Sequence, residues 1–276
     1  MGYSDAMKVF ITGGTGYIGS HVVRELVQRG DDVRALARTD ERARQLEALG
    51  ATVVRGDLLD SDVLRAAAAD ADAAIHLANT GGEQTADADR AAAAAIQEGL
   101  GDGTYVHTGG AWIYGNTHGE ADEDAEQHPP ALTAWRAANE AEVMERGNAV
   151  LVMPGVVYGE DQGLIPLAYA DGRYVGNGTY KTALIHVEDA AHLFVLALDA
   201  PHGSRFVGVT ESVPGIEIAE ALRPGEARPE TLEEAQARLG PLAEAMTLDQ
   251  EVSSARAREQ LGWEPRHTDA RTELAA

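Results

Sequence analysis

The sequence contains no cysteine. Disulfide bonds, thiolate nucleophiles and cysteine-ligated metal sites are therefore excluded. It also lacks any apolar run that approaches the ~20 residues a helix needs to cross a bilayer, so we expect no membrane-spanning segment. The first residues, MGYSDAM, have neither the basic nor the apolar region of a signal peptide. Together these absences predict a cytoplasmic protein.

Positive charge is scarce as well. The chain has 22 lysine and arginine residues against 45 aspartate and glutamate residues, a formal net charge of −23, and its only lysines are Lys8 and Lys181. Such an acidic surface repels nucleic acid and anionic membranes, and we expect neither as a partner. With 276 residues, the chain is long enough for one elaborated domain, or for one domain with a smaller appendage.

The most informative stretch is VFITGGTGYIG at residues 9–19. An apolar run ends at Thr12, glycines follow at 13, 14, 16 and 19, and an amphipathic segment begins at Ile18, which predicts a buried strand, a tight turn and a helix. Glycines let a backbone approach a pyrophosphate closely, and the start of a helix offers it amide groups and a partial positive charge. The spacing is G-x-x-G-x-x-G, and an ordinary glycine-rich turn is the alternative interpretation.

Strands and helices then alternate along the chain. We expect further strands at 32–37, 52–55, 73–77, 104–108, 150–153, 184–187 and 204–209, and helices at 40–49, 61–69, 90–100, 132–146, 164–170 and 190–198. This alternation predicts a parallel sheet with helices on both faces, in which ligands bind at the carboxyl ends of the strands. We therefore predict a Rossmann-type, doubly wound α/β fold with a small C-terminal substrate-binding lobe.

The predicted fold divides the chain into two parts. Residues 1–153 form the predicted dinucleotide-binding domain, which is completed by about 183–210. Residues 154–182 and 211–276 form the predicted lobe, where the chain breaks into short pieces and prolines stand at positions 224, 229 and 241. We expect this lobe to cover a small-molecule substrate.

Seven motifs follow one another along the chain: TGGTGYIG (12–19), GDLLD (56–60), HLA (76–78), WIYG (112–115), PGVVYG (154–159), HVEDAA (186–191) and ARAREQLGWEPR (255–266). In this order and spacing they resemble the extended or atypical branch of the short-chain dehydrogenase/reductase superfamily, the epimerase/dehydratase-like proteins. The resemblance spans nearly the whole chain and implies a nicotinamide coenzyme and a small carbonyl or hydroxyl substrate. Dimers are common among these proteins, so a homodimer is one expectation.

The resemblance also places the coenzyme residue by residue. The pyrophosphate would lie against Gly13, Thr15, Gly16, Tyr17 and Ile18, and the adenine would lie between Asp57 and Leu58. The ribose side would be lined by Leu77, Ala78 and Asn79. The nicotinamide would be surrounded by Thr108, Pro154, Gly155, Val156 and Val157. Two of these residues have alternative explanations. Asp57 could cap the helix that follows it, and Leu77 could belong to the core.

The choice between NAD and NADP depends on the end of the second strand. An NAD-preferring site has a carboxylate there that accepts from the ribose 2′-OH. Here Ala37 is followed by Arg38, and a guanidinium suits a 2′-phosphate through bidentate, charge-assisted bonds. We therefore predict NADP(H) rather than NAD(H). Asp40 weakens the positive field, and a solvent-exposed arginine without a ligand is the alternative.

The usual catalytic pair of these proteins, Tyr-x-x-x-Lys on one helix, is absent. At that spacing both side chains share a helix face, and the ammonium lowers the pKa of the phenol so that it can pass a proton to the substrate. No lysine of this chain has a tyrosine four residues before it. The corresponding helix reads AWRAAN at 134–139, so the pair is replaced by Trp135 and Asn139, or by Ala134 and Ala138.

Other polar groups are candidates for the catalytic work. Thr108 follows the fifth strand, where the resemblance implies a hydroxyl that orients a substrate oxygen. Tyr114 is the nearest replacement proton donor, with a purely structural role as its alternative. His107, His118 and Arg136 are further candidates.

Three functions remain open at this point. The first is an NADP-dependent oxidoreductase or epimerase-like enzyme that moves hydride between nicotinamide C4 and a substrate carbon above Thr108. The second is a non-catalytic NAD(P)-binding redox sensor or scaffold, and the third is an isomerase or lyase on the same fold. The sequence has no G-x-S-x-G motif, so we expect no serine hydrolase, and it has no P-loop motif. It also lacks H-E-x-x-H, since His186 and His192 are six residues apart, so we expect no metal site.

Overall fold

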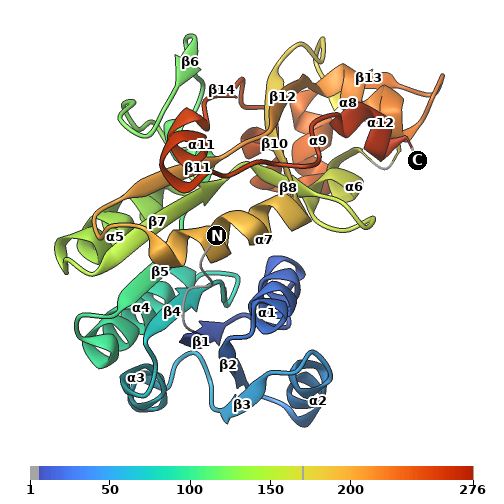
Figure 1. Cartoon of the computed structure of the whole chain (residues 1–276). Helices are drawn as coiled ribbons and strands as arrows, with labels where there is room; N and C mark the ends of the chain where they lie inside the picture. The colour runs from blue at the N-terminus through green and yellow to red at the C-terminus, as the bar shows by residue number, and fades with distance from the viewer. Residues whose placement is uncertain (1–5, 170, 276) are drawn as a thin grey trace. The chain divides into compact units, whose positions relative to one another are not determined.

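The computed structural model describes residues 6–169 and 171–275, and Figure 1 shows its helices and strands. These residues form two compact units. Unit 1 runs to Gly109 and adds Ala138–Val152 and Ala191–Arg205. Unit 2 comprises the described residues of Gly110–Ala137 and Met153–Ala190, and those from Phe206 onward.

One large sheet organises unit 1. Its elements are β1 (Lys8–Thr12), α1 (Tyr17–Arg29), β2 (Asp32–Ala37), α2 (Asp40–Ala48), β3 (Thr52–Arg55), α3 (Ser61–Ala69), β4 (Ala73–His76), α4 (Thr85–Leu100), β5 (Thr104–Thr108), α5 (Ala134–Glu145) and β7 (Ala149–Pro154). The strand order is β11-β7-β5-β4-β1-β2-β3, where β11 is Arg205–Gly208, and the pairings from β7 to β3 are parallel. Helices α1 and α2 lie on one side of β1 to β3, and α3 lies on the other (Figure 1). The predicted doubly wound α/β fold is confirmed.

The core of unit 1 follows from its apolar strands and its alanine-rich helix. Phe10, Ile11 and Leu26 have no exposed surface. Phe10 packs in one cluster with residues of α3, α4 and β5, and most of the α4 residues in that cluster are alanines. Alanine has the highest helix propensity and a small side chain, so α4 is stable and close to its neighbours.

Helix α4 begins at Thr85 rather than at the expected residue 90. The expectation rested on apolar periodicity, and a polar residue interrupts that pattern: Asp89 lies on the buried face, with 8% of its surface exposed. A carboxylate on a helix is usually a surface group. The sequence pattern therefore hid the first turns of α4.

Unit 2 consists of short strands and helices. Its small sheets have the orders β12-β10-β8, β13-β9 and β14-β6. The strands are β6 (Glu120–Ala121), β8 (Val156–Tyr158), β9 (Arg173–Val175), β10 (Lys181–His186), β12 (Glu211–Pro214), β13 (Arg228–Glu230) and β14 (Glu251–Val252). The helices are η1 (Ala111–Tyr114), α6 (Leu164–Tyr169), α8 (Gly215–Leu222), α9 (Leu232–Leu239), α10 (Leu242–Ala245), α11 (Ala255–Leu261) and α12 (Ala270–Leu274).

Helices α5 and α7 and strands β7 and β11 each cross from one unit to the other in sequence. Helix α7 (Val187–Leu196) begins in unit 2 and continues in unit 1, where η2 (Ala197–Asp199) follows it. The expected helix at 164–170 is present as α6, and residue 170 lies outside the described residues. Within 6–169 and 171–275, no helix is long and apolar enough to span a membrane. The functional division into a coenzyme domain and a substrate lobe stays a prediction.

Candidate functional site

The carboxyl ends of β1 to β5 lie at one edge of the sheet, because these strands run parallel. Most of the predicted coenzyme residues follow those ends: Gly13, Thr15, Gly16, Tyr17 and Ile18 after β1, Arg38 after β2, Asp57 and Leu58 after β3, and Leu77, Ala78 and Asn79 after β4. Thr108 is the last residue of β5. The structure therefore brings the predicted contacts of unit 1 to a single edge.

The glycine loop after β1 is packed tightly against its neighbours. Gly13 has φ +76°, and a Cβ at this position would lie 2.6 Å from the amide nitrogen of Ala78. A Cβ on Gly19 would lie 2.1 Å from the carbonyl oxygen of Gly13, and the Gly16 amide donates to the same oxygen at 2.8 Å. Any side chain at Gly13 or Gly19 would therefore displace backbone, so this tight loop requires glycine at both positions.

The amino end of α1 has no side-chain cap. Gly16 is its N-cap, and its first turn contains no acidic residue. By contrast, Thr39 caps α2 by accepting from the Arg42 amide, and Asp60 caps α3 by accepting from the Val63 amide. The partial positive charge at the start of α1 is therefore not offset by a capping side chain or by an acidic residue of the first turn, which suits an anion.

An open cleft of about 560 Å³ lies beside the ends of β2, β3 and β4; it is lined by Arg38, Asp57, Leu59, Thr80, Gly81, Glu83 and Gln84. Arg38 Nη1 is 3.5 Å from Asp57 Oδ2, and their side chains are 77% and 38% exposed. Asp57 Oδ1 also accepts from the Leu59 amide at 3.0 Å. Since Asp60 caps α3, the alternative explanation of Asp57 as the helix cap is wrong.

A second guanidinium reaches the glycine loop. Arg42 Nη1 donates to the carbonyl oxygen of Thr15 at 3.1 Å. The Thr39 cap fixes the first turn of α2, and this turn carries Arg42. Arg42 was not expected at the site from the sequence, because a charged residue in a polar helix has the pattern of an ordinary surface group. Its position three residues after a capping threonine was the available signal.

The loop after β4 is fastened to the end of β1. The Leu77 amide donates to the Thr12 carbonyl at 3.2 Å, and the Ala78 amide donates to Thr12 Oγ1 at 3.4 Å. Asn79 Oδ1 accepts from the Gly81 amide at 2.7 Å, which shapes the turn before α4. Leu77 and Ala78 are half-buried, so Leu77 is not a fully buried core residue.

A buried carboxylate lies behind these strand ends. Asp89 Oδ1 is 3.4 Å from His76 Nε2, and Asp89 Oδ2 is 3.7 Å from His107 Nε2. Asn139 Nδ2 donates to Asp89 Oδ2 at 3.1 Å. Burial by itself raises the pKa of Asp89, but the hydrogen bond from His76 and the charge of the two imidazoles outweigh it and hold this pKa well below its usual value. Asp89 is therefore ionised at neutral pH.

The two predicted catalytic residues lie in different units. Thr108, in unit 1, donates its hydroxyl hydrogen to the His76 carbonyl at 2.6 Å. Tyr114 lies in unit 2; it is 2% exposed and its hydroxyl donates to Met153 Sδ at 3.6 Å. Of the further candidates, His107 is 1% exposed and its Nδ1 is 2.9 Å from the hydroxyl of Tyr105.

The remaining predicted nicotinamide contacts, Pro154, Gly155, Val156 and Val157, also belong to unit 2. They form the end of β7 and the start of β8. A Cβ on Gly155 would lie 2.6 Å from the carbonyl oxygen of Ala183. Gly155 thus permits the close approach of β10 to this segment.

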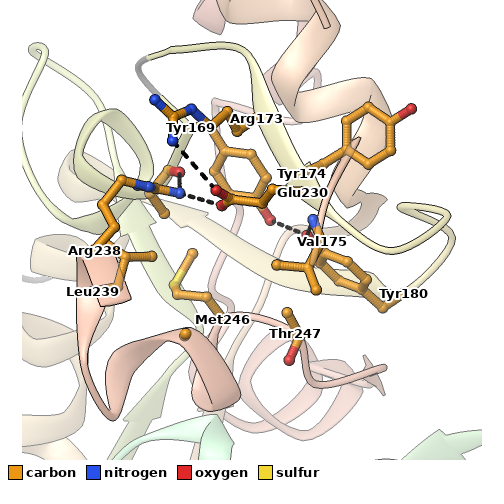
Figure 2. Close-up of a pocket in the computed structure, with 12 residues that line it drawn as sticks. Tyr169, Arg173, Tyr174, Val175, Tyr180, Glu230, Arg238, Leu239, Met246 and Thr247 are labelled. Carbon is orange, nitrogen blue, oxygen red and sulfur yellow. Dashed lines mark hydrogen bonds and ion pairs between the residues drawn. The ribbon is translucent and has the colours of Figure 1, made fainter. Parts of the chain in front are cut away.

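A small pocket lies in unit 2 (Figure 2), lined by Ala168, Tyr169, Arg173, Tyr174, Val175, Tyr180, Glu230, Arg238, Leu239, Ala243, Met246 and Thr247. Glu230 is 7% exposed and lies between two guanidinium groups: Arg238 Nη2 is 2.5 Å from Oε1, and Arg173 Nη1 is 3.6 Å from Oε2. The internal volume, about 10 Å³, is enough for no more than one water. These ion pairs therefore hold β9, β13 and α9 together rather than line a substrate cavity.

Unit 2 also contains a stacked pair of imidazoles. The rings of His186 and His267 have centroids 3.6 Å apart and planes 23° apart. His267 Nδ1 is 3.0 Å from Glu273 Oε1, and His267 Nε2 is 3.3 Å from Glu188 Oε2. Because ionised carboxylates only accept, both nitrogens of His267 donate and the ring is an imidazolium. Burial lowers the pKa of His267, but the two carboxylates outweigh burial and raise this pKa above its usual value.

His186, Glu188 and His267 can each offer one ligand atom within 4.8 Å of the others. A tetrahedral metal site needs lone pairs that converge on one point. The lone pairs of stacked rings lie in parallel planes and do not converge on one point. Both N–H groups of His267 already donate to carboxylates. Burial, with the positive charge of His267, lowers the pKa of His186, so a neutral ring faces a charged one. The arrangement fits an ion-paired imidazole stack better than a metal centre.

The model of the NAD dependent epimerase/dehydratase family matches residues 9–207. The chain belongs to this family. An uncharacterized protein of Saccharomyces cerevisiae (strain ATCC 204508 / S288c) is 32% identical over 284 residues, which cover 94% of this chain and 95% of that protein. The 4-hydroxy-2-methyl-3-oxo-4-farnesyl-3,4-dihydroquinoline-1-oxide ketoreductase of Stigmatella aurantiaca is 27% identical over 234 residues, 75% of this chain and 69% of the ketoreductase.

A solved structure of the same fold is that of dTDP-glucose 4,6-dehydratase from Bacillus anthracis str. Ames, in complex with NAD. Its TM-score to this chain is 0.79 at 15% identity, and the match covers 98% of this chain and 94% of the dehydratase. At this identity the likeness shows the fold alone. Family membership gives the broad function, an NAD(P)-dependent, oxidoreductase-like protein.

Helix α5 of this epimerase/dehydratase-family protein is fastened to α4. Asn139 is 1% exposed, and its Nδ2 donates to the Ala86 carbonyl at 2.8 Å as well as to Asp89. Trp135 is half-buried, and the Arg136 guanidinium lies 4.6 Å from its ring centroid. The structural part played by Asn139 was not expected from the sequence, because its partner Asp89 belongs to another helix.

Proposed function

We propose that this epimerase/dehydratase-family protein is an NADP(H)-dependent oxidoreductase that acts on a small carbonyl or hydroxyl compound. The observation that carries the proposal is the glycine loop, which leads into an uncapped helix start and has two arginines beside it. Gly16 leaves the start of α1 without a side-chain cap, Arg38 lies in the adjoining cleft, and Arg42 contacts the loop itself. The bound coenzyme would supply or accept the hydride.

The two arginines support NADP(H) over NAD(H). The Arg38–Asp57 pair is largely exposed, and an exposed ion pair contributes only about 0–1 kcal/mol to stability. Its release therefore costs little. Charge-assisted hydrogen bonds from guanidinium groups to a 2′-phosphate are stronger than neutral ones, so the phosphate would replace Asp57 as the partner of Arg38.

The coenzyme preference is tested by calorimetric titration of NADPH and NADH into the wild type and two variants. We expect Arg38→Ala and Arg42→Ala each to weaken NADPH binding about tenfold, the loss of roughly one charge-assisted hydrogen bond, and to leave NADH binding within about twofold. Arg44 is an exposed arginine of α2, the helix that carries Arg42. Arg44→Ala is the matched control and should change neither the NADPH affinity nor the NADH affinity. Equal wild-type affinities for NADPH and NADH would contradict the assignment.

The ketoreductase relative supports a carbonyl as the reacting group. The hydrogen of Thr108 is donated to the His76 carbonyl, and a hydroxyl oxygen has two acceptor lone pairs. A ketone oxygen that accepted from Thr108 would therefore require this hydrogen to turn away from His76. Tyr114 is our candidate proton donor, because it now donates to a thioether, a weak acceptor that a substrate oxygen can replace.

A second candidate, a non-catalytic NAD(P)-binding sensor, is favoured by α5, where Asn139 is used to hold α4. Consumption of NADPH against a panel of ketones and aldehydes distinguishes the two. For the enzyme we expect turnover that falls at least ~10²-fold in Tyr114→Phe, the usual size of a general-acid contribution. Tight coenzyme binding without turnover on any panel member would favour the sensor. Turnover unchanged in Tyr114→Phe would remove Tyr114 from the mechanism.

A further inference from the structure

Two parallel strands, β4 and β5, bring imidazoles to the carboxylate of Asp89, and the end of β1 contacts one of these imidazoles. Thr12 and His76 are the last residues of β1 and β4, and His107 is next to the last residue of β5. Thr12 is 0%, His76 1% and His107 1% exposed. A buried anion is costly unless its neighbours donate hydrogen bonds to it. Asp89 is therefore a fixed negative charge toward which its polar neighbours are oriented.

A chain of polar contacts leads from the carboxylate to the loop after β4. An ionised carboxylate only accepts, so the nitrogen that faces it, Nε2 of His76, carries the hydrogen. On the other side of the same ring, Nδ1 is 2.6 Å from Thr12 Oγ1, and the two atoms share one hydrogen. Thr12 Oγ1 is thus held by the His76 ring, and it accepts from the Ala78 amide at 3.4 Å.

The path ends on the proposed coenzyme loop. Ala78 lies directly against Gly13, since a Cβ on Gly13 would meet the Ala78 amide nitrogen at 2.6 Å. The Thr12 carbonyl also accepts from the Leu77 amide. The Thr12 hydroxyl therefore helps to set the distance between the loop after β4 and the glycine loop, both of which follow strand ends at the same edge of the sheet.

We propose that Asp89 is a positioning residue for the coenzyme: acting through His76 and Thr12, it holds the Ala78 loop against Gly13 in the arrangement that binds the dinucleotide. The inference rests on the proposed function, because it assumes that the coenzyme binds at the glycine loop. It goes beyond that function by assigning a role to a carboxylate that lies behind the strands and does not line the cleft.

The test is a double-mutant cycle on NADPH affinity with Asp89→Asn and Thr12→Val. We expect each single variant to bind NADPH about tenfold more weakly, and the double variant to be no more than about tenfold weaker rather than a hundredfold, because both break the same path. Thr12→Ser keeps the hydroxyl and should restore binding to within about twofold of the wild type. This rescue separates positioning from a general packing effect.

Gln97→Leu is the matched control. Gln97 is another buried polar residue of α4, and its Nε2 donates to the Val143 carbonyl and to Asn148 Oδ1 rather than toward Thr12. The Gln97→Leu substitution should lower the midpoint of unfolding and leave NADPH affinity within about twofold of the wild type. If Asp89→Asn does not fold, the comparison of Thr12→Val with Thr12→Ser still decides: equal affinities in these two variants would overturn the proposal.

The outcomes separate this inference from the proposed function. A wild type that binds neither NADPH nor NADH overturns both. A wild type that binds coenzyme, with additive effects of Asp89→Asn and Thr12→Val or with no effect of either, overturns the positioning role alone. Non-additive losses with rescue by Thr12→Ser support it.

Discussion

Gly19 illustrates how a single atom decides the local structure of the site. An added Cβ would lie 2.1 Å from the carbonyl oxygen and 2.8 Å from the carbonyl carbon of Gly13, both backbone atoms. A flexible side chain could move aside, but this turn is fixed between β1 and α1. The close packing of helix and loop at Gly19 keeps the start of α1 near the backbone of Gly13.

We expect Gly19→Ala to lower the free energy of unfolding by about 1–3 kcal/mol, the usual cost of overpacking a filled site, and to weaken NADPH binding. Gly110→Ala is the control for stability, because its φ of −178° is extended and the nearest atom to an added Cβ is 4.0 Å away. Urea denaturation of both variants measures the difference. An unfolding free energy for Gly19→Ala equal to that of the wild type would show that the loop yields easily.

Residue patterns predicted the glycine loop but not the contacts among Thr12, His76 and Asp89. Gly13, Gly16 and Gly19 form a contiguous signal, and the alternation of apolar runs with helical segments gave the sheet. The contact between His76 and Asp89 depends on how β4 and α4 pack, and Thr12 lies 64 residues from His76 in the chain. Such partners are set by tertiary packing, so no local spacing indicates them.

At the scale of elements, the C-terminal segment is held to unit 2 by α7. Asp189, in the first turn of α7, accepts from the amides of Arg266 and His267 at 2.8 and 2.9 Å. Its own carbonyl accepts from Trp263 Nε1 at 3.1 Å. The stack of His267 on His186 completes this attachment, and it is the part that responds to pH.

The charged groups around His267 determine the sign of that response. Glu188 and Asp189 face it from α7, Glu273 from α12 and the neutral His186 from β10. Its folded-state pKa is raised above the ordinary value of about 6.5. The charged ring therefore contributes stability that is fully present below about pH 6.5 and is lost as pH rises through the folded-state pKa.

We expect His267→Gln to destabilise the protein at pH 5.5 and to have a smaller effect at pH 9. Because the His267 side chain is 26% exposed, solvent screening limits the pH-dependent part to about 1 kcal/mol or less. Urea denaturation at the two pH values measures it. His202→Gln is the control, since His202 contacts the Thr104 hydroxyl rather than a carboxylate. A difference between His267→Gln and wild type that grows from pH 5.5 to pH 9 would contradict the assigned charge.

At the scale of the whole molecule, the two units differ in how much the sequence revealed. The large sheet of unit 1 follows from long-range alternation, and its strands 32–37, 52–55 and 104–108 have the bounds that were expected. Unit 2 is assembled from strands as short as Glu120–Ala121 and Glu251–Val252, which pair across the chain. A pair of residues carries no periodicity, so these elements and the Glu230 ion pairs depend on tertiary contacts.

The net charge of −23 also acts on the whole molecule. It opposes the approach of any anion, including a dinucleotide, and raising salt screens this repulsion. The uncapped start of α1, Arg38 in the cleft and Arg42 on the glycine loop must overcome it locally. The coenzyme is therefore expected to bind at one place on an otherwise repelling surface.

Amide hydrogen exchange with and without NADPH tests that claim most directly. We predict that coenzyme slows exchange in peptides covering residues 12–20 and 38–42, with the largest effect at the glycine loop, and leaves the peptide covering 228–239 unchanged. Protection confined to other peptides, or binding of NADPH that leaves residues 12–20 exchanging at the free rate, would contradict the account.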